Sequence, residues 1–264
     1  MSAATLTVSA WSALLIRDLR AFLRSRAQVS SSLIFPLMLL GILGVGISEG
    51  LEPSRVREGD YVSFLVPGII VMTALFSSTF SSASFYQDRD SGMLKVFLAS
   101  PHSPGVILLG KSLAAITIGS AQALVVLAIA AAIPGVDLAW QYGVFASLVL
   151  AIGTVLALNV LLSGLAQLLA SRIRTMQGFH LVMNLVHFPL LFFSGAFFPL
   201  ADLPVWLYGL ALANPLTYAV DLLQLAVYAD SGSGHVGIGI DLAVLLGLAA
   251  VLFTWGMRRH PMME

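Results

Sequence analysis

The stretch YVSFLVPGIIVMTALFSSTFSSASFY, residues 61–86, runs for 26 residues without a charged side chain. As an α-helix it would extend about 39 Å at 1.5 Å per residue, which exceeds the roughly 30 Å of a bilayer core. A helix that is this long and apolar on every side is typical of a membrane span. This stretch therefore predicts a protein built from membrane-spanning helices.

The composition of the whole chain agrees with that prediction. Of its 264 residues, 58% are hydrophobic and only 10% are charged, whereas soluble domains carry about 25% charged residues. The mean hydropathy is +0.95. The chain has no cysteine, so both a disulfide framework and a thiolate site are excluded. We expect an all-α polytopic membrane protein.

Further apolar runs extend the prediction to six membrane spans. These runs cover residues 29–48, 61–86, 112–133, 141–170, 178–198 and 236–257. If both termini are cytoplasmic, eleven of the thirteen basic residues fall in cytoplasmic segments, and only Arg55 and Arg57 fall outside. Because positive charge resists translocation, this distribution predicts a multi-pass protein of the cytoplasmic membrane with both termini inside.

Residues 199–235 are expected to form an outer re-entrant segment between the fifth and sixth spans. Its apolar part, 204–228, is long enough for a seventh span, but Asn214-Pro215 interrupts it. Proline removes a backbone donor and disfavours helix in the preceding residue. We therefore expect a helical hairpin of two short helices that enter the outer leaflet and return, packed against protein.

Residues 10–27 precede the first span and are expected to form an amphipathic helix along the cytoplasmic surface of the membrane. Its apolar face would hold Leu15, Leu19 and Phe22. Its basic face, directed toward anionic headgroups, would hold Arg17, Arg20 and Arg24. A helix packed on another part of the protein is the alternative.

The octapeptide GVILLGKS, 105–112, satisfies the pattern of a phosphate-binding P-loop. That chemistry requires a strand before a glycine-rich loop and a helix after it. Here a proline-containing segment precedes the first glycine, and four apolar residues separate the two glycines. We interpret the match as chance, with Lys111 extending from the inner end of the third span toward the headgroups. The chain is not expected to bind ATP itself.

Three stretches together resemble the permeases of the type-2 ATP-binding-cassette (ABC) exporter family, which includes drug-resistance, nodulation-factor and polysaccharide exporters. The first is YVSFLVPGIIVM, 61–72, and the second is DRDSGMLKVFLASPHSPGVILLGKSL, 88–113. The third, FFSGAFFPLADLPVWLYGLALANPLTYAVDLLQL, 192–225, is the most specific. The resemblance covers nearly the whole chain and implies one transmembrane permease domain over 1–264.

The resemblance further implies a half-transporter. Two six-span permeases, as a homodimer or with a related chain, would lie side by side, and each would dock on a separate ATPase subunit. ATP and Mg²⁺ would bind that partner, and this chain would hold no cofactor. We also expect the lipid bilayer as a partner, and no nucleic acid. The cargo would be amphipathic or lipid-like: a drug, a lipid or a glycoconjugate.

Residues 87–105 would be the cytoplasmic coupling loop of such a permease. Exposed apolar surface of the kind carried by residues 93–98 usually marks a protein contact, and an aromatic side chain, Phe97, is the expected anchor. A short helix lying flat on the lipid is the alternative. The residues expected to couple to the ATPase are Asp88, Arg89, Asp90, Met93, Leu94, Phe97 and Leu98.

Histidine and amide side chains inside the predicted spans are few. His180, Asn184 and His187 fall at helical spacing on the fifth span, and they would either bond to neighbouring helices or line the substrate path. By family resemblance, the first and fifth spans line that path. Its candidate residues are Phe35, Met38, His180, Asn184, His187, Phe188 and Phe192. Gln122, Asn159 and Gln167 are expected to join helices.

Two other function classes remain alternatives. A membrane scaffold or assembly subunit would carry nothing, and it would have no reason for both a docking loop and a re-entrant hairpin. A secondary carrier usually needs a titratable side chain at membrane depth, and the predicted spans hold no charge at their centres. The sequence offers no nucleophile triad, metal-ligand cluster or paired carboxylates at membrane depth, so the chain is not expected to be an enzyme.

Overall fold

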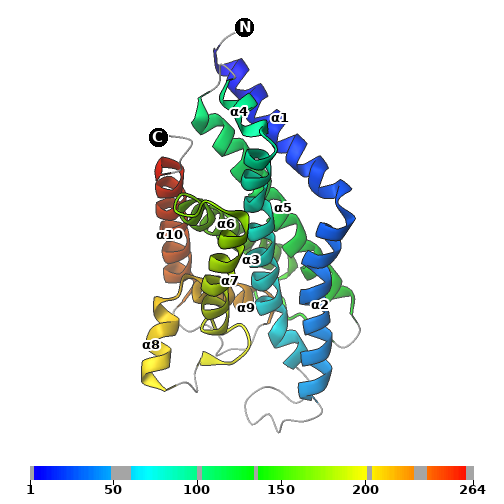
Figure 1. Cartoon of the computed structure of the whole chain (residues 1–264). Helices are drawn as coiled ribbons and strands as arrows, with labels where there is room; N and C mark the ends of the chain where they lie inside the picture. The colour runs from blue at the N-terminus through cyan, green and yellow to red at the C-terminus, as the bar shows by residue number, and fades with distance from the viewer. Residues whose placement is uncertain are drawn as a thin grey trace.

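The computed structural model describes residues 3–48, 61–99, 103–133, 136–200, 204–228 and 237–259. These residues form an elongated bundle of α-helices (Figure 1). The helices are α1 (Ala3–Arg24), α2 (Arg26–Ser48), α3 (Tyr61–Asp90), α4 (Met93–Leu98), α5 (Pro104–Ala132), α6 (Val144–Ala170), α7 (Met176–Phe192), α8 (Val205–Ala213), α9 (Pro215–Val227) and α10 (Ile238–Arg259).

The structure confirms the all-α, membrane-spanning fold. Within the described ranges, α2, α3, α5, α6 and α10 are long and apolar enough to cross a bilayer. The fifth expected span is α7, which is apolar but has only 17 residues. It ends at Phe192 instead of residue 198, because the chain turns at Gly195, whose φ of 81° is left-handed and favours glycine. The start of α1, the end of α10 and α4 lie at one end of the bundle (Figure 1).

The predicted interruption at Asn214-Pro215 is also confirmed. Helices α8 and α9 meet there at an angle of 90°. The Asn214 side chain stabilises the bend in two ways: its Oδ1 accepts from the backbone N–H of Leu216 at 3.0 Å, and its Nδ2 donates to the carbonyl of Leu190 in α7 at 2.6 Å. Neither helix alone is long enough to cross a bilayer. Residues 201–203 and 229–236 of the expected outer segment lie outside the described residues.

Helix α3 runs through the centre of the bundle. It packs against α2, α5, α6, α7 and α9. Leu65, Ile69 and Ile70 are 0% exposed, as expected for a helix that is apolar all round. Small residues allow this close packing: a side chain at Gly68 would collide with the carbonyl oxygen of Ala196. The stretch that predicted the fold is thus the axis of the protein.

Helices α6 and α10 touch backbone to backbone. A Cβ atom on Gly164 would lie 2.5 Å from the carbonyl carbon of Leu252, and one on Gly256 would lie 2.6 Å from the carbonyl oxygen of Gly164. Membrane helices associate through such small-residue contacts because lipid supplies no hydrophobic force between them. Gly164 and Gly256 therefore set the spacing of this helix pair.

Two of the three buried amides predicted to join helices do so. Gln122 in α5 donates to the Ser32 hydroxyl in α2, and Gln167 in α6 donates to the Ser112 hydroxyl in α5 at 2.8 Å. Asn159 differs, because its Nδ2 bonds the carbonyl of Val155 in its own helix at 2.9 Å. Its Oδ1 occupies the place that a side chain on the facing Gly119 would take, so Asn159 contributes packing and not an interhelical bond.

Candidate functional site

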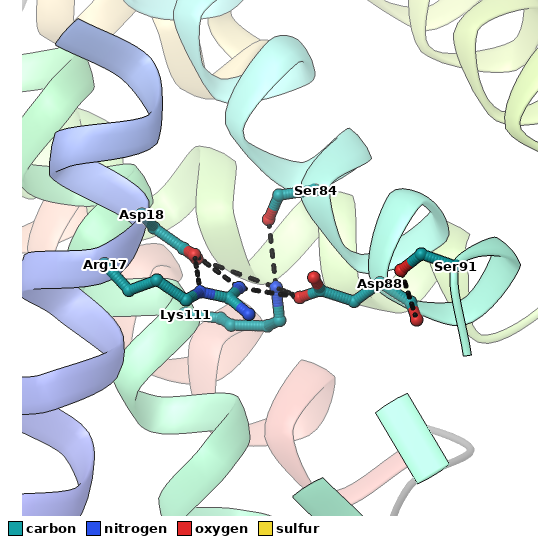
Figure 2. A network of polar contacts seen from close by, with 6 residues as sticks. All are labelled: Arg17, Asp18, Ser84, Asp88, Ser91 and Lys111. Carbon is teal, nitrogen blue, oxygen red and sulfur yellow. Dashed lines mark hydrogen bonds and ion pairs between the residues drawn. The ribbon is translucent and has the colours of Figure 1, made fainter. Parts of the chain in front are cut away.

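Four charged side chains meet near the α4 end of the bundle (Figure 2). This charged cluster consists of Arg17 and Asp18 from α1, Asp88 from α3 and Lys111 from α5. Arg17 Nη2 bonds Asp88 at 2.8 Å, and Lys111 forms ion pairs with both Asp88 and Asp18. Lys111 also donates to the hydroxyl of Ser84 at 3.2 Å. The cluster joins three helices that are distant in sequence.

The charged cluster is partly shielded from solvent, since the side chains of Arg17 and Asp88 are 34% and 14% exposed. Lys111 is 7% exposed and Asp18 is 9% exposed. Buried charges are tolerated only when they are paired, and here two cations face two anions. Burial by itself lowers the pKa of Arg17, but the carboxylates of Asp88 and Asp18 raise it to above its usual value, so the guanidinium stays charged.

Two predictions about these residues are wrong. Arg17 does not face away from the protein with Arg20 and Arg24, because it turns inward to Asp88. Lys111 does not extend toward the membrane surface, because two carboxylates hold it inside the bundle. In both cases a facing helix supplies the opposite charge, and the side chain forms an ion pair within the bundle.

The packing of α1 also differs in register from the prediction. The buried residues of its described part are Leu14, Asp18 and Phe22, spaced four apart, while Leu15 and Leu19 are only partly buried. The helix lies along α5. A Cβ atom on Gly110 of α5 would be 3.1 Å from the Cα of Trp11 and from the Cβ of Leu14. Gly110, the second glycine of the apparent P-loop, therefore allows α1 to pack closely against α5.

The whole octapeptide 105–112 is part of the continuous helix α5. A phosphate-binding loop needs consecutive backbone N–H groups that point at the ligand from a non-helical turn. Beyond the first turn of α5 these groups are bonded to the carbonyls of the preceding turn. The P-loop pattern thus has a structural explanation in close helix packing.

Helix α4 follows α3 after a two-residue turn at Ser91 and Gly92, where Gly92 has a φ of 76°. Its inner face holds Leu94 and Phe97, which pack with Leu14, Phe85 and Ile107 in a small apolar core.

The outer face of α4 holds Met93 and Val96, which are 43% and 63% exposed. We call these two residues the docking face.

The remaining candidate coupling residues are placed as follows. Phe97 is half-buried, and the guanidinium of Arg17 lies 4.9 Å from its ring centre. Arg89 donates to the carbonyl of Arg174, whereas Asp90 is exposed. The side chain of Leu98 lies outside the described residues. Asp88 and Phe97 therefore face inward, and Met93, together with Val96, faces outward.

The candidate path residues are partly brought together. Phe35 of α2 and Asn184 and Phe188 of α7 line one groove with Ser31 and Phe76, with a volume of about 310 Å³. We call this the α2–α7 groove.

The other path candidates lie apart from the lining of the α2–α7 groove. Met38 is half-exposed one turn beyond Phe35, and Phe192 stacks against Phe188 with ring centres 6.4 Å apart. His187 points into the bundle, where its Nδ1 lies 3.3 Å from the hydroxyl of Thr79, and His180 lies beside the ring of Phe179. The expected polar stripe thus divides: Asn184 faces the groove, and His187 joins two helices.

Sequence reasoning missed one further pair of buried acids. Asp221 of α9 and Asp241 of α10 are 2% and 0% exposed, and their side chains contact one another. It also missed the role of Asp18. The available signal for Asp221 and Asp241 was that each is an isolated acidic residue in an apolar helix, a placement that is unfavourable unless another element supplies a partner. Asp18 lies among the arginines of α1 and gave no such signal.

Residues 9–228 match the protein family described as ABC-2 type transporter. The chain is 28% identical to Nodulation protein J of Bradyrhizobium diazoefficiens over 88% of each chain. It is 31% identical to the probable multidrug ABC transporter permease YbhR of Escherichia coli over 65% of this chain, and spans only 45% of that relative's length. It is 30% identical to the putative transport permease ycf38 of Cyanophora paradoxa over 74% of this chain and 66% of that protein.

Proposed function

Because this chain belongs to the ABC-2 type transporter family, whose members are transport components and not catalysts, we propose that it is the permease of an ATP-driven exporter. In this proposal a separate ATPase subunit binds ATP and Mg²⁺ and supplies the energy. The permease lies in the cytoplasmic membrane with both termini inside. The apparent P-loop lies within α5, which supports the placement of nucleotide on the partner.

The observation that carries the proposal is the two-faced helix α4. A six-residue helix on the outside of a membrane bundle has no structural need for two exposed apolar side chains, yet Met93 and Val96 are exposed. Its inner face is fixed by Leu94 and Phe97 in the small apolar core. A fixed helix with an uncovered apolar face suits a partner protein that covers it. We propose that this partner is the ATPase subunit.

The α2–α7 groove supports an amphipathic cargo. It combines the rings of Phe35, Phe76 and Phe188 with the amide of Asn184, as ligand sites commonly combine aromatic walls with a few polar groups. On the same helices Ile34 and Leu185 are 60% and 68% exposed. We propose that a second permease subunit covers these faces and completes a path for a drug, lipid or glycoconjugate. Relatives named as a nodulation protein and a multidrug permease support this range of substrates.

Reconstitution with an ATPase tests the proposed function. The purified chain should bind an ABC ATPase subunit from the same organism. Amphipathic compounds should stimulate ATP hydrolysis by this complex at least about tenfold more than they stimulate hydrolysis by the ATPase subunit alone. Transport is measured as ATP-dependent uptake of a fluorescent amphipathic compound into inverted vesicles. A complex that forms but neither transports nor responds to any compound would favour the scaffold function instead.

Single cysteines test the proposed orientation, because the chain has no native cysteine. Asp137, between α5 and α6, and Ser103, just before α5, are both exposed. In intact cells an impermeant maleimide should label Asp137→Cys, while Ser103→Cys should react only after the membrane is opened. The reverse pattern would place the termini outside and the docking face away from any cytoplasmic ATPase.

A further inference from the structure

We propose that a cavity between α1, α3 and α5 binds a phospholipid headgroup that carries both a phosphate and a primary ammonium. The cavity has a volume of about 410 Å³, which falls in the range of about 300–1,000 Å³ that is common for small-ligand sites. It lies beside the charged cluster, whose four residues all line its wall. It is separate from the α2–α7 groove, which has different lining residues.

The wall of this cavity combines charged, amide and apolar groups. Gln28 and Gln87 add side-chain amides to the charges of Arg17 and Asp88, and Phe22 and Ile118 add apolar surface. Along α5 the lining changes from Lys111 to alanines and then to Ile118, in the direction away from α4. A ligand that fits this wall has a polar head and an apolar body.

The charged cluster leaves one donor and one acceptor available to such a head. Within the described part of the chain, the bonds of Arg17 use Nε and Nη2, so Nη1 remains a donor. The contacts of Asp88 with Arg17 and Lys111 both use Oδ2, and in Figure 2 no dashed line ends on its other carboxylate oxygen. A phosphate can therefore accept from Arg17, and an ammonium can donate to Asp88 Oδ1.

The location of the cavity indicates a lipid as the source of that head. The cavity lies where the charged helix α1 gives way to the apolar α2, around Ser25, and where the long apolar helices α3 and α5 carry their charged ends. Headgroups occupy this boundary in a bilayer.

The net charge of the cluster selects the kind of headgroup. Two cations and two anions give no net attraction for an anionic headgroup, and such a group would place its phosphate beside Asp18 and Asp88 without an ammonium to balance them. The site therefore favours phosphatidylethanolamine over phosphatidylglycerol.

Native mass spectrometry of the purified full-length chain tests the proposal. The protein is exchanged into nanodiscs of phosphatidylethanolamine and phosphatidylglycerol in equal amounts and then released. We expect about tenfold more retained phosphatidylethanolamine, the ratio that corresponds to about 1.4 kcal/mol. Equal retention of the two lipids would overturn the proposal. The measurement involves no ATPase, so its failure is distinct from failure of the proposed function.

A matched pair of variants ties the lipid to this cavity. Ala21 lines it and Ala13 does not, and both are exposed positions of α1, so neither substitution disturbs the core. Ala21→Trp should fill the cavity and abolish the preference, whereas Ala13→Trp should keep it. Melting temperatures equal to that of the parent protein will show that both variants are folded. An unchanged preference in folded Ala21→Trp would locate the lipid elsewhere and refute the assignment.

Discussion

Replacing Met93 and Val96 together by aspartate should release the ATPase subunit from the permease and leave the membrane bundle intact. Both side chains are exposed on α4, so the change costs the isolated permease little. In the complex two carboxylates would face the apolar surface of the ATPase subunit that covers the docking face, which costs about 2.7 kcal/mol or more. That energy corresponds to an affinity at least about a hundredfold weaker. Co-purification of the ATPase on the tagged permease measures the loss.

Two matched variants separate docking from folding. Ser91→Asp adds a charge at an exposed position just before α4 and should retain the ATPase. Leu94→Asp places the charge in the small apolar core, where Leu94 is 9% exposed, and should lower the melting temperature of the permease itself. If Met93→Asp/Val96→Asp keeps normal co-purification and transport, α4 is not the docking element.

Asp88→Asn should destabilise the permease through its charged cluster. Within the described part of the chain, the substitution leaves Asp18 as the one counter-charge for Arg17 and Lys111. Breaking a buried ion pair costs about 3–5 kcal/mol, and we expect about 3 kcal/mol because the side chain of Arg17 is 34% exposed. The thermal midpoint of the detergent-solubilised protein reports the loss.

The exposed neighbour Asp90 provides the control. It lies 3.5 Å from Arg89 with its side chain 63% exposed, and surface pairs contribute at most about 1 kcal/mol, so Asp90→Asn should be nearly neutral. The double variant Asp88→Asn/Lys111→Met should lose less stability than the two single losses combined, because it removes charges of both signs. Equal stability of Asp88→Asn and Asp90→Asn would show that the cluster does not hold the helices together.

The sequence predicted the spans and the broken hairpin because both depend on local properties. The length of an apolar run determines whether a helix can cross a bilayer, and Asn214-Pro215 disrupts a helix wherever it occurs. The end of α7 was misplaced by six residues, since residues 193–198 are as apolar as the helix before them. A left-handed glycine, and not a change in polarity, ends that helix.

The charged cluster could not be predicted because its partners come from three helices. Helical spacing placed Arg17 with Arg20 and Arg24, but the direction in which an arginine turns depends on what the next helix presents. Lys111 is separated from Asp18 by 93 residues, and only the packing of α1 on α5 through Gly110 brings them together. A single sequence does not indicate how α1 is positioned along α5.

The two faces of α4 illustrate the same limit at a smaller scale. In MLKVFL every residue except Lys95 is apolar, so periodicity cannot distinguish an inner face from an outer one. Aromatic character favoured Phe97 as the anchor, yet the ring is covered by Arg17. The candidate path residues divided for a related reason, since His187 and Phe188 are adjacent in α7, yet His187 is buried and Phe188 is exposed.

The short turn between α3 and α4 connects α4 tightly to the central helix of the bundle. Only Ser91 and Gly92 separate α4 from α3, and Leu94 and Phe97 pack α4 against the small apolar core. The two helices therefore have little freedom to move relative to one another. Because α3 is surrounded by close-packed helices and packed interiors resist compression, we expect a displacement of α4 to move α3 along its axis. In the proposed exporter such a displacement would reach Phe76, which lies on α3 in the wall of the α2–α7 groove.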